Sequence, residues 1–131
     1  MKPLLAALSI VGLFISSAVA GDIPAISHDD LKAAIEKKEV VIIDVNGTDS
    51  YKETHIPGAI DYAAQKDNLA VALPKDKGAL IVAYCGNEHC KAYKQAANAA
   101  VELGYTNVKH YSPGIAGWKA KEAPKQPSSK S

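Results

Sequence analysis

Two cysteines stand five positions apart in one short segment, and the chain contains no others. Cys85 directly follows the apolar run Leu80 to Tyr84, and a helical pattern starts about six residues later. A thiol at the carboxyl end of a parallel strand faces the amides and the positive dipole end of the next helix. Both favour the thiolate, so the position predicts a nucleophilic sulfur. The competing interpretation is a small buried hydrophobic residue that ends a strand.

The residues between the cysteines tolerate unusual backbone angles, so this loop can curl its amides toward the sulfur. Across such a curl, Cys90 can come within the Cα spacing of about 4.4–6.8 Å that a disulfide needs. Cys90 is then a candidate resolving cysteine for a persulfide or sulfenate on Cys85. The alternative is that Cys90 points away and only packs. The candidate substrate-binding loop is Gly86, Asn87, Glu88, His89, Cys90 and Lys91.

A metal site is the other chemistry that these residue types allow. Cys85, His89 and Cys90, with His110 as a distant fourth ligand, would suit Zn²⁺ or Cu⁺. His89 and Cys90 are adjacent, however, and the chain has no paired C-x-x-C arrangement. We therefore expect no metal at these residues.

Alternating strands and helices must position this cysteine. Val40–Ile43 and Leu80–Tyr84 are apolar runs without alternation, which is typical of strands covered on both faces. Helices and strands in alternation predict a single α/β domain, a parallel sheet with helices on both faces. The first expected helix begins after its cap, Ser27. Further helices are expected over residues 49–55, 63–72 and 91–103 and in a short segment that contains Trp118, and a further strand is expected over 107–111.

Composition limits the class of partner. Of 131 residues, 47% are hydrophobic and 22% charged, which is ordinary for a globular domain. Fifteen basic residues oppose fourteen acidic ones, and all fifteen are lysine. A balanced surface without arginine argues against nucleic-acid binding, because phosphate recognition favours fork-shaped guanidinium donors.

Residues 1–20 have the pattern of a secretory signal peptide. Lys2 precedes an apolar stretch from Leu4 to Ile15, and Ala18-Val19-Ala20 matches the small-residue cleavage pattern. The competing interpretation is an uncleaved N-terminal anchor. We expect cleavage, a domain over residues 21–121 that is periplasmic or secreted and free of the membrane, and a disordered Lys/Pro/Ser tail over 122–131.

Three segments stand in order around Cys85. They are Val41-Ile42-Ile43-Asp44-Val45 with His55-Ile56-Pro57-Gly58-Ala59-Ile60, Tyr84-Cys85, and Gly104-Tyr105-Thr106-Asn107-Val108 with Gly114-Ile115-Ala116-Gly117-Trp118. Together they resemble the signatures of the rhodanese-like domain family. The resemblance implies a five-stranded, mostly parallel sheet flanked by helices on both faces. It also implies that Cys85 carries a persulfide, taking sulfur from a small sulfur-containing anion such as thiosulfate or polysulfide and passing it to cyanide or to a small-molecule or protein thiol, with no metal or organic cofactor. Amides of residues 86–91 would stabilise the sulfur anion.

The loop departs from the family at the places that bind thiosulfate. Cys90 stands where thiosulfate-using loops commonly end in arginine, and Asn46 stands where an arginine usually follows the aspartate. Lys91 supplies a point charge rather than a bidentate fork, and Glu88 adds a negative charge. These departures predict inefficient use of thiosulfate.

Three functions therefore remain open on the sequence. The first is a sulfurtransferase using Cys85, the second a thiol–disulfide redox protein using Cys85 and Cys90, and the third a non-catalytic binding module. Asp44 ends a strand and is a weaker catalytic candidate, since an aspartate there commonly ties down backbone amides. His55 is expected to be a hydrogen-bonded structural residue.

Overall fold

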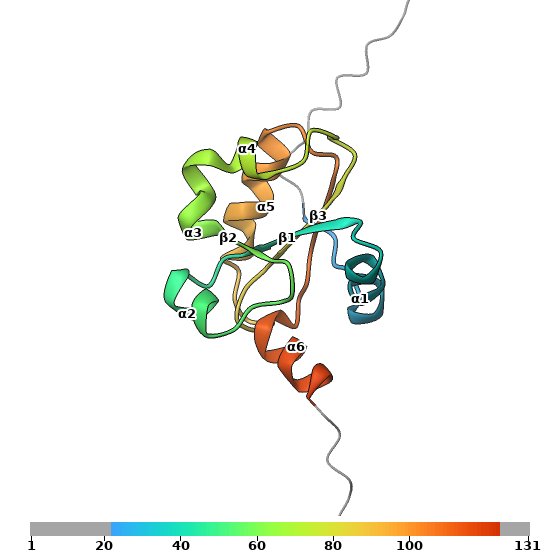
Figure 1. Ribbon diagram of the computed structural model, residues 1–131, viewed down its shortest axis with the longest axis vertical. Coiled ribbons are helices and arrows are strands. Elements are labelled where there is room, and N and C mark those ends of the chain that lie inside the picture. The colour runs from blue at the N-terminus through green and yellow to red at the C-terminus, as the bar shows by residue number, and fades with distance from the viewer. Residues whose placement is uncertain (1–21, 124–131) are drawn as a thin grey trace, which may run out of the picture.

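A single parallel sheet forms the centre of the protein, which is described by a computed structural model over residues 22–123. Its four strands lie in the order β2-β1-β3-β4, and Figure 1 shows the sheet between its helices. The two apolar runs found in the sequence form the two central strands, β1 and β3. These strands are apolar throughout because both of their faces are covered. The strands are β1 (Val40–Asp44), β2 (Ile60–Asp61), β3 (Leu80–Tyr84) and β4 (Asn107–His110).

Helices cover both faces of the sheet. One core contains Ile42 and Val82 and packs against α1 and α6, and the other contains Ile43 and Ala83 and packs against α4 and α5. Alternate residues of one strand thus enter different cores, which is why the strands are apolar throughout. The helices are α1 (His28–Glu36), α2 (Thr48–Glu53), α3 (Tyr62–Gln65), the 3-10 turn η1 (Lys66–Asn68), α4 (Leu69–Ala72), α5 (Tyr93–Glu102) and α6 (Gly114–Glu122).

The prediction of five strands is wrong for the described residues, which contain four. The edge position beside β4 is taken by a single parallel bridge between Ala25 and His110. Ile26 N–H donates to the His110 carbonyl, and His110 N–H donates to the Pro24 carbonyl, each at 2.9 Å. Pro24 has no N–H to extend this ladder, so the pairing stays one bridge long.

The predicted helix over 63–72 is also divided. The segment consists of α3, η1 and α4, and Asp61 caps its start by accepting from Ala63 N–H at 3.1 Å. Only Leu69 is buried among the residues of these three short elements. One buried side chain provides little packing to hold a continuous helix, since helices depend on a buried apolar face.

Helix α6 runs to Glu122, so the predicted tail over 122–131 starts too early. Glu122 contacts α1 through His28 Nε2 at 2.7 Å and Lys32 Nζ at 3.1 Å, and these two partners hold the pKa of its carboxyl below the usual value. The predicted signal peptide and the rest of the tail lie outside the described residues. Within residues 22–123, no helix has the length and apolar character needed to cross a membrane.

Candidate active site

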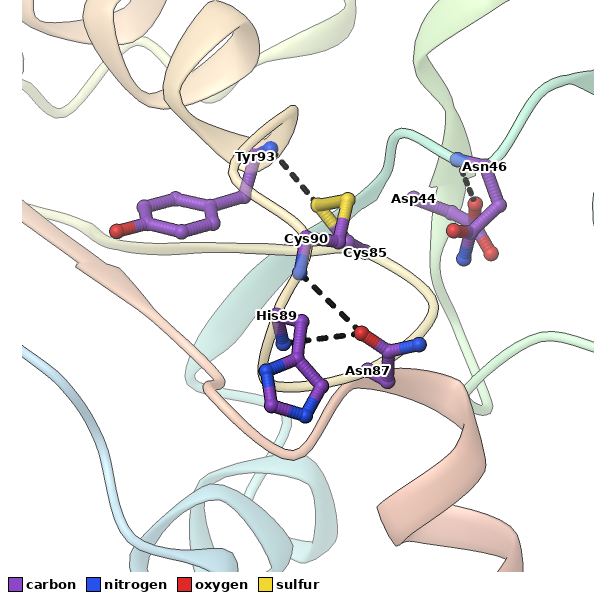
Figure 2. The surroundings of a disulfide bond; sticks show 7 residues. All are labelled: Asp44, Asn46, Cys85, Asn87, His89, Cys90 and Tyr93. Atoms are coloured by element: carbon purple, nitrogen blue, oxygen red, sulfur yellow. Dashed lines mark hydrogen bonds between the residues drawn. A yellow bond between two sulfur atoms is a disulfide. The ribbon is translucent and has the colours of Figure 1, made fainter.

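Cys85 lies at the carboxyl edge of the sheet, directly after β3, and only 2% of its surface is exposed. The N–H of Tyr93, the first residue of α5, donates to Cys85 Sγ at 3.0 Å (Figure 2). The next two amides, of Lys94 and Gln95, donate to loop carbonyls at 3.1 Å. The start of α5 therefore directs one amide donor at the sulfur, an arrangement that favours a thiolate when the disulfide is reduced.

Cys90 is joined to Cys85 by a disulfide in the structure, with a Cα–Cα distance of 6.0 Å. Cys90 therefore does not point away from Cys85. The spacing lies within the usual range for disulfides, of about 4.4–6.8 Å. Cys85 is buried and Cys90 is half-buried, so Cys90 is the more accessible residue of the pair.

The predicted convergence of loop amides on the sulfur is not present in this disulfide form. The N–H groups of His89 and Cys90 donate instead to Asn87 Oδ1, at 2.9 and 3.2 Å (Figure 2). An asparagine side chain competes well for amides two and three residues ahead, and here it wins over the sulfur. The Tyr93 donor belongs to the start of the next helix, whose amides were predicted to face the thiol, but the residue itself was not named because that helix was expected to begin at residue 91.

The polar loop side chains face solvent rather than the sulfur. Asn87, Glu88, His89 and Lys91 are exposed, and His89 Nε2 lies 3.7 Å from the Glu88 carboxylate. An open hollow of about 320 Å³ adjoins the loop and is lined by Asn87, Glu88, His89, Pro113, Ala116 and Gly117. Neither Cys85 nor Cys90 lines this hollow.

No group of three or more His, Cys, Asp and Glu side chains lies together as a metal site anywhere in residues 22–123. His110, the distant candidate ligand, hydrogen-bonds the Ile23 carbonyl through Nδ1 at 2.9 Å and stacks on the Tyr93 ring. Its contacts tie the N-terminal segment and α5 to β4.

A buried polar network lies beside the cysteine at the ends of β1 and β3. Asp44 is fully buried, and it accepts from the Tyr84 hydroxyl at 2.5 Å and from Asn46 N–H at 2.8 Å. The same hydroxyl accepts from Ile56 N–H at 3.0 Å. Asp44 thus accepts from the backbone amide of Asn46, as expected for a structural aspartate at the end of a strand. It also holds the side chain of Tyr84, the residue before Cys85. His55 hydrogen-bonds the Tyr51 carbonyl at 2.7 Å.

The backbone behind the cysteine loop is held by the first turn of α6. Ile115 N–H donates to the Cys85 carbonyl and Ala116 N–H to the Gly86 carbonyl, each at 3.0 Å. Gly114 makes this approach possible, because it has φ +63° and a Cβ there would lie 2.6 Å from the Cys85 carbonyl oxygen. The loop is therefore fixed from α5 on one side and from α6 on the other.

The Tyr84 hydroxyl gives the fold a predictable response to alkali. Burial, and then the hydrogen bond to Asp44, raise the pKa of Tyr84 far above its usual value. Unfolded tyrosine loses its proton near pH 10 while the folded state keeps it, so stability is complete below that pH and is lost above it. We expect the free energy of unfolding to fall by about 1.4 kcal/mol per pH unit above about pH 10.

Urea unfolding between pH 8 and pH 11.5 measures this slope, and Tyr84→Phe is the control. The variant should lose the Tyr84 share of the slope and keep the contribution of Tyr111, whose pKa is raised by burial and by Glu122. Equal slopes in the two proteins would contradict the assignment to Tyr84.

Comparison with known proteins identifies the family of this site. The family model described as Rhodanese-like domain matches residues 27–121, which include both cysteines and all four strands of the described sheet. The chain belongs to the rhodanese-like domain family. Its cysteine loop thus lies within the matched domain.

Three proteins similar to this rhodanese-like domain match it over most of their own length. Thiosulfate sulfurtransferase GlpE of Coxiella burnetii is 31% identical over 96 residues, which is 72% of this chain and 86% of the relative. A solved Bacillus halodurans protein, BH2092, shares 30% identity with a TM-score of 0.64 and covers 75% of this chain and 72% of its own. The human single-domain sulfurtransferase TSTD1 superposes with a TM-score of 0.61 at 23% identity, over 78% of this chain and 100% of its own, and shows the fold alone.

Proposed function

We propose that this protein is a sulfurtransferase that carries sulfane sulfur as a persulfide on Cys85. The observation that carries the proposal is the Tyr93 N–H, which lies 3.0 Å from Cys85 Sγ at the carboxyl edge of the sheet. Membership of the rhodanese-like family and the relative named thiosulfate sulfurtransferase support it. In the disulfide form the sulfur is occupied, so the reaction starts from the reduced protein.

The reaction has two displacements at sulfur. The Cys85 thiolate attacks the outer sulfur of a donor such as thiosulfate or polysulfide. The donor's S–S bond breaks and its electron pair leaves with the departing group, which is sulfite in the case of thiosulfate. A thiophilic acceptor then attacks the terminal sulfur and Cys85 leaves as the thiolate. The Tyr93 N–H stabilises the charge that returns to Cys85 Sγ, and no cofactor takes part.

The charge of the loop favours donors other than thiosulfate. The chain has no arginine, and Glu88 is exposed on the loop beside the cysteines. A dianion therefore meets a carboxylate and no bidentate donor as it approaches the site. We propose that a small organic persulfide, which carries less negative charge than thiosulfate, loads Cys85 faster than thiosulfate, with a thiol, free or on a protein, as the acceptor.

Export remains part of the proposal. The apolar N-terminal segment with its Ala18-Val19-Ala20 pattern supports a periplasmic or secreted protein. Disulfides persist in such compartments, so a joined Cys85–Cys90 pair agrees with this location.

A second candidate function is thiol–disulfide exchange. It is favoured by one observation, the disulfide between Cys85 and Cys90 at a Cα–Cα distance of 6.0 Å. Such a protein needs both cysteines, whereas sulfur loading on Cys85 needs only one. Cys90→Ser therefore separates the two candidates.

The direct test is the intact mass of reduced protein after incubation with polysulfide or thiosulfate under anaerobic conditions. We expect the Cys90→Ser protein to gain one sulfur atom, because its Cys85 cannot form the disulfide. Cys85→Ser should gain none, since Cys85 is the nucleophile.

Alkylation of Cys85 by iodoacetamide at neutral pH is the accompanying control. An activated thiolate reacts fast, so loading and rapid alkylation should occur together. Slow alkylation and no adduct with either donor would contradict the proposal and leave the binding-module hypothesis. Disulfide reduction without an adduct would leave the redox protein.

A further inference from the structure

The disulfide occupies the sulfur on which the proposed persulfide forms. We propose that Cys90 attacks the Cys85 persulfide and releases sulfide, so that the protein reduces sulfane sulfur and ends each turn in the disulfide form. This inference rests on the proposed function, because it requires a persulfide on Cys85. It adds a second product and a role for Cys90 that sulfur transfer alone does not need.

The loop places Cys90 for this attack without help from the disulfide itself. Asn87 Oδ1 accepts from the amides of His89 and Cys90, and the Asn87 carbonyl accepts from Cys90 N–H at 3.3 Å. These hydrogen bonds do not involve sulfur, so the turn that brings Cys90 to Cys85 persists in the reduced protein. The Cα–Cα distance of 6.0 Å then suits a new S–S bond with little movement of the backbone.

The reaction balances in atoms and electrons. The Cys90 thiolate attacks Cys85 Sγ, the inner sulfur of the persulfide, and a Cys85–Cys90 bond forms. The bond from Cys85 Sγ to the terminal sulfur breaks, and that sulfur leaves with the electron pair as HS⁻. The two cysteine thiols are oxidised by two electrons, and the sulfane sulfur is reduced to sulfide. With thiosulfate as donor, the products are sulfite, HS⁻ and the disulfide.

The burial of the two cysteines determines which of them an external reductant attacks when it reduces the Cys85–Cys90 disulfide. Cys85 is 2% exposed and Cys90 is half-buried, so an external thiol attacks Cys90. Cys85 then leaves as the thiolate, which Tyr93 N–H stabilises at 3.0 Å. A second thiol of the reductant completes a disulfide of its own and frees Cys90. A dithiol, small or on a protein, is therefore the co-substrate, and two electrons pass from it to each sulfane sulfur.

The test is a single turnover of the reduced full chain, with the reductant removed, after one equivalent of thiosulfate, whose loading step releases sulfite and no sulfide. We expect wild-type protein to release about one sulfide per chain and to return to the mass of the disulfide form. In Cys90→Ser, sulfide release should fall by about ten-fold, and the mass should rise by one sulfur that persists. The readouts are sulfide trapped by monobromobimane and intact mass.

Two controls keep the outcomes distinct. Circular dichroism compares the fold of Cys90→Ser and Cys90→Ala with that of reduced wild type, and either folded variant serves. Sulfide release that is equal in wild type and variant, or a wild-type persulfide that persists beside a free Cys90, would overturn the inference while sulfur transfer stands. No adduct and no sulfide in any protein would overturn the proposed function and the inference with it.

Discussion

Replacing Gly114 by alanine is expected to lower the free energy of unfolding by about 4 kcal/mol. The added Cβ would lie 2.6 Å from the Cys85 carbonyl oxygen, 2.7 Å from Gly86 C and 2.8 Å from Asn87 N. All three are backbone atoms of the cysteine loop, so no flexible side chain can move aside. Gly114 also has φ +63°, which strains any residue with a Cβ. The same displacement moves the peptide behind Cys85, so sulfur loading of the reduced protein should slow as well.

Gly104→Ala is the matched control. Gly104 has φ +96°, but an added Cβ would meet nothing within 4 Å. Its cost should be that of the backbone conformation alone, about 1 kcal/mol. Urea unfolding of the disulfide-intact proteins measures both values. Equal losses in the two variants would show that the contact between α6 and the cysteine loop is not tight, against the present description.

Replacing Asp44 by alanine is expected to lower the free energy of unfolding by about 3 kcal/mol at neutral pH. Asp44 is fully buried, and its loss leaves the Tyr84 hydroxyl and Asn46 N–H without their acceptor. Each buried group without a partner costs about 1–3 kcal/mol. The loss acts on the residue before Cys85, yet no hydrogen bond joins Asp44 to either cysteine among the described residues.

Asp76→Ala is the matched control, because Asp76 accepts from the amide two residues ahead just as Asp44 does. The Asp76 bond to Gly78 N–H, at 2.9 Å, is exposed, so its loss should cost less than about 1 kcal/mol. Urea unfolding measures stability. Mass spectrometry measures sulfur loading in the absence of urea, at a temperature at which both variants are folded. A folded Asp44→Ala protein of normal stability that fails to load sulfur would contradict the structural role and favour a catalytic one.

The position of Cys85 was predictable because it depends on local patterns. Two apolar runs fixed the central strands, and a glycine after an alanine-rich helix marked the end of α5. Parallel strands bring their carboxyl ends to one edge, so Cys85 had to lie there. The loop left two alternatives for Cys90, and the disulfide decides in favour of its approach to Cys85, whereas its chemical role remains a prediction.

The contacts that fix the loop were not predictable, because they join residues far apart in the chain. The Tyr84–Asp44 bond connects positions 40 residues apart, and it depends on the register that pairs these two residues across β1 and β3. The direction of the loop amides depended on a local competition between Asn87 Oδ1 and the Cys85 sulfur, which the residue types do not decide. The short edge pairing at Ala25 likewise depends on a tertiary contact with His110.

The ring closed by Cys85 and Cys90 is small, since the two residues are only five positions apart. A crosslink of this size removes little freedom from the unfolded chain, worth about 2 kcal/mol on chain-entropy arguments. The strand ladders and both apolar cores lie outside this ring and stay whole when it opens. We therefore expect the protein to change its oxidation state while folded. Repeated reduction and formation of the disulfide should leave the sheet and both apolar cores intact.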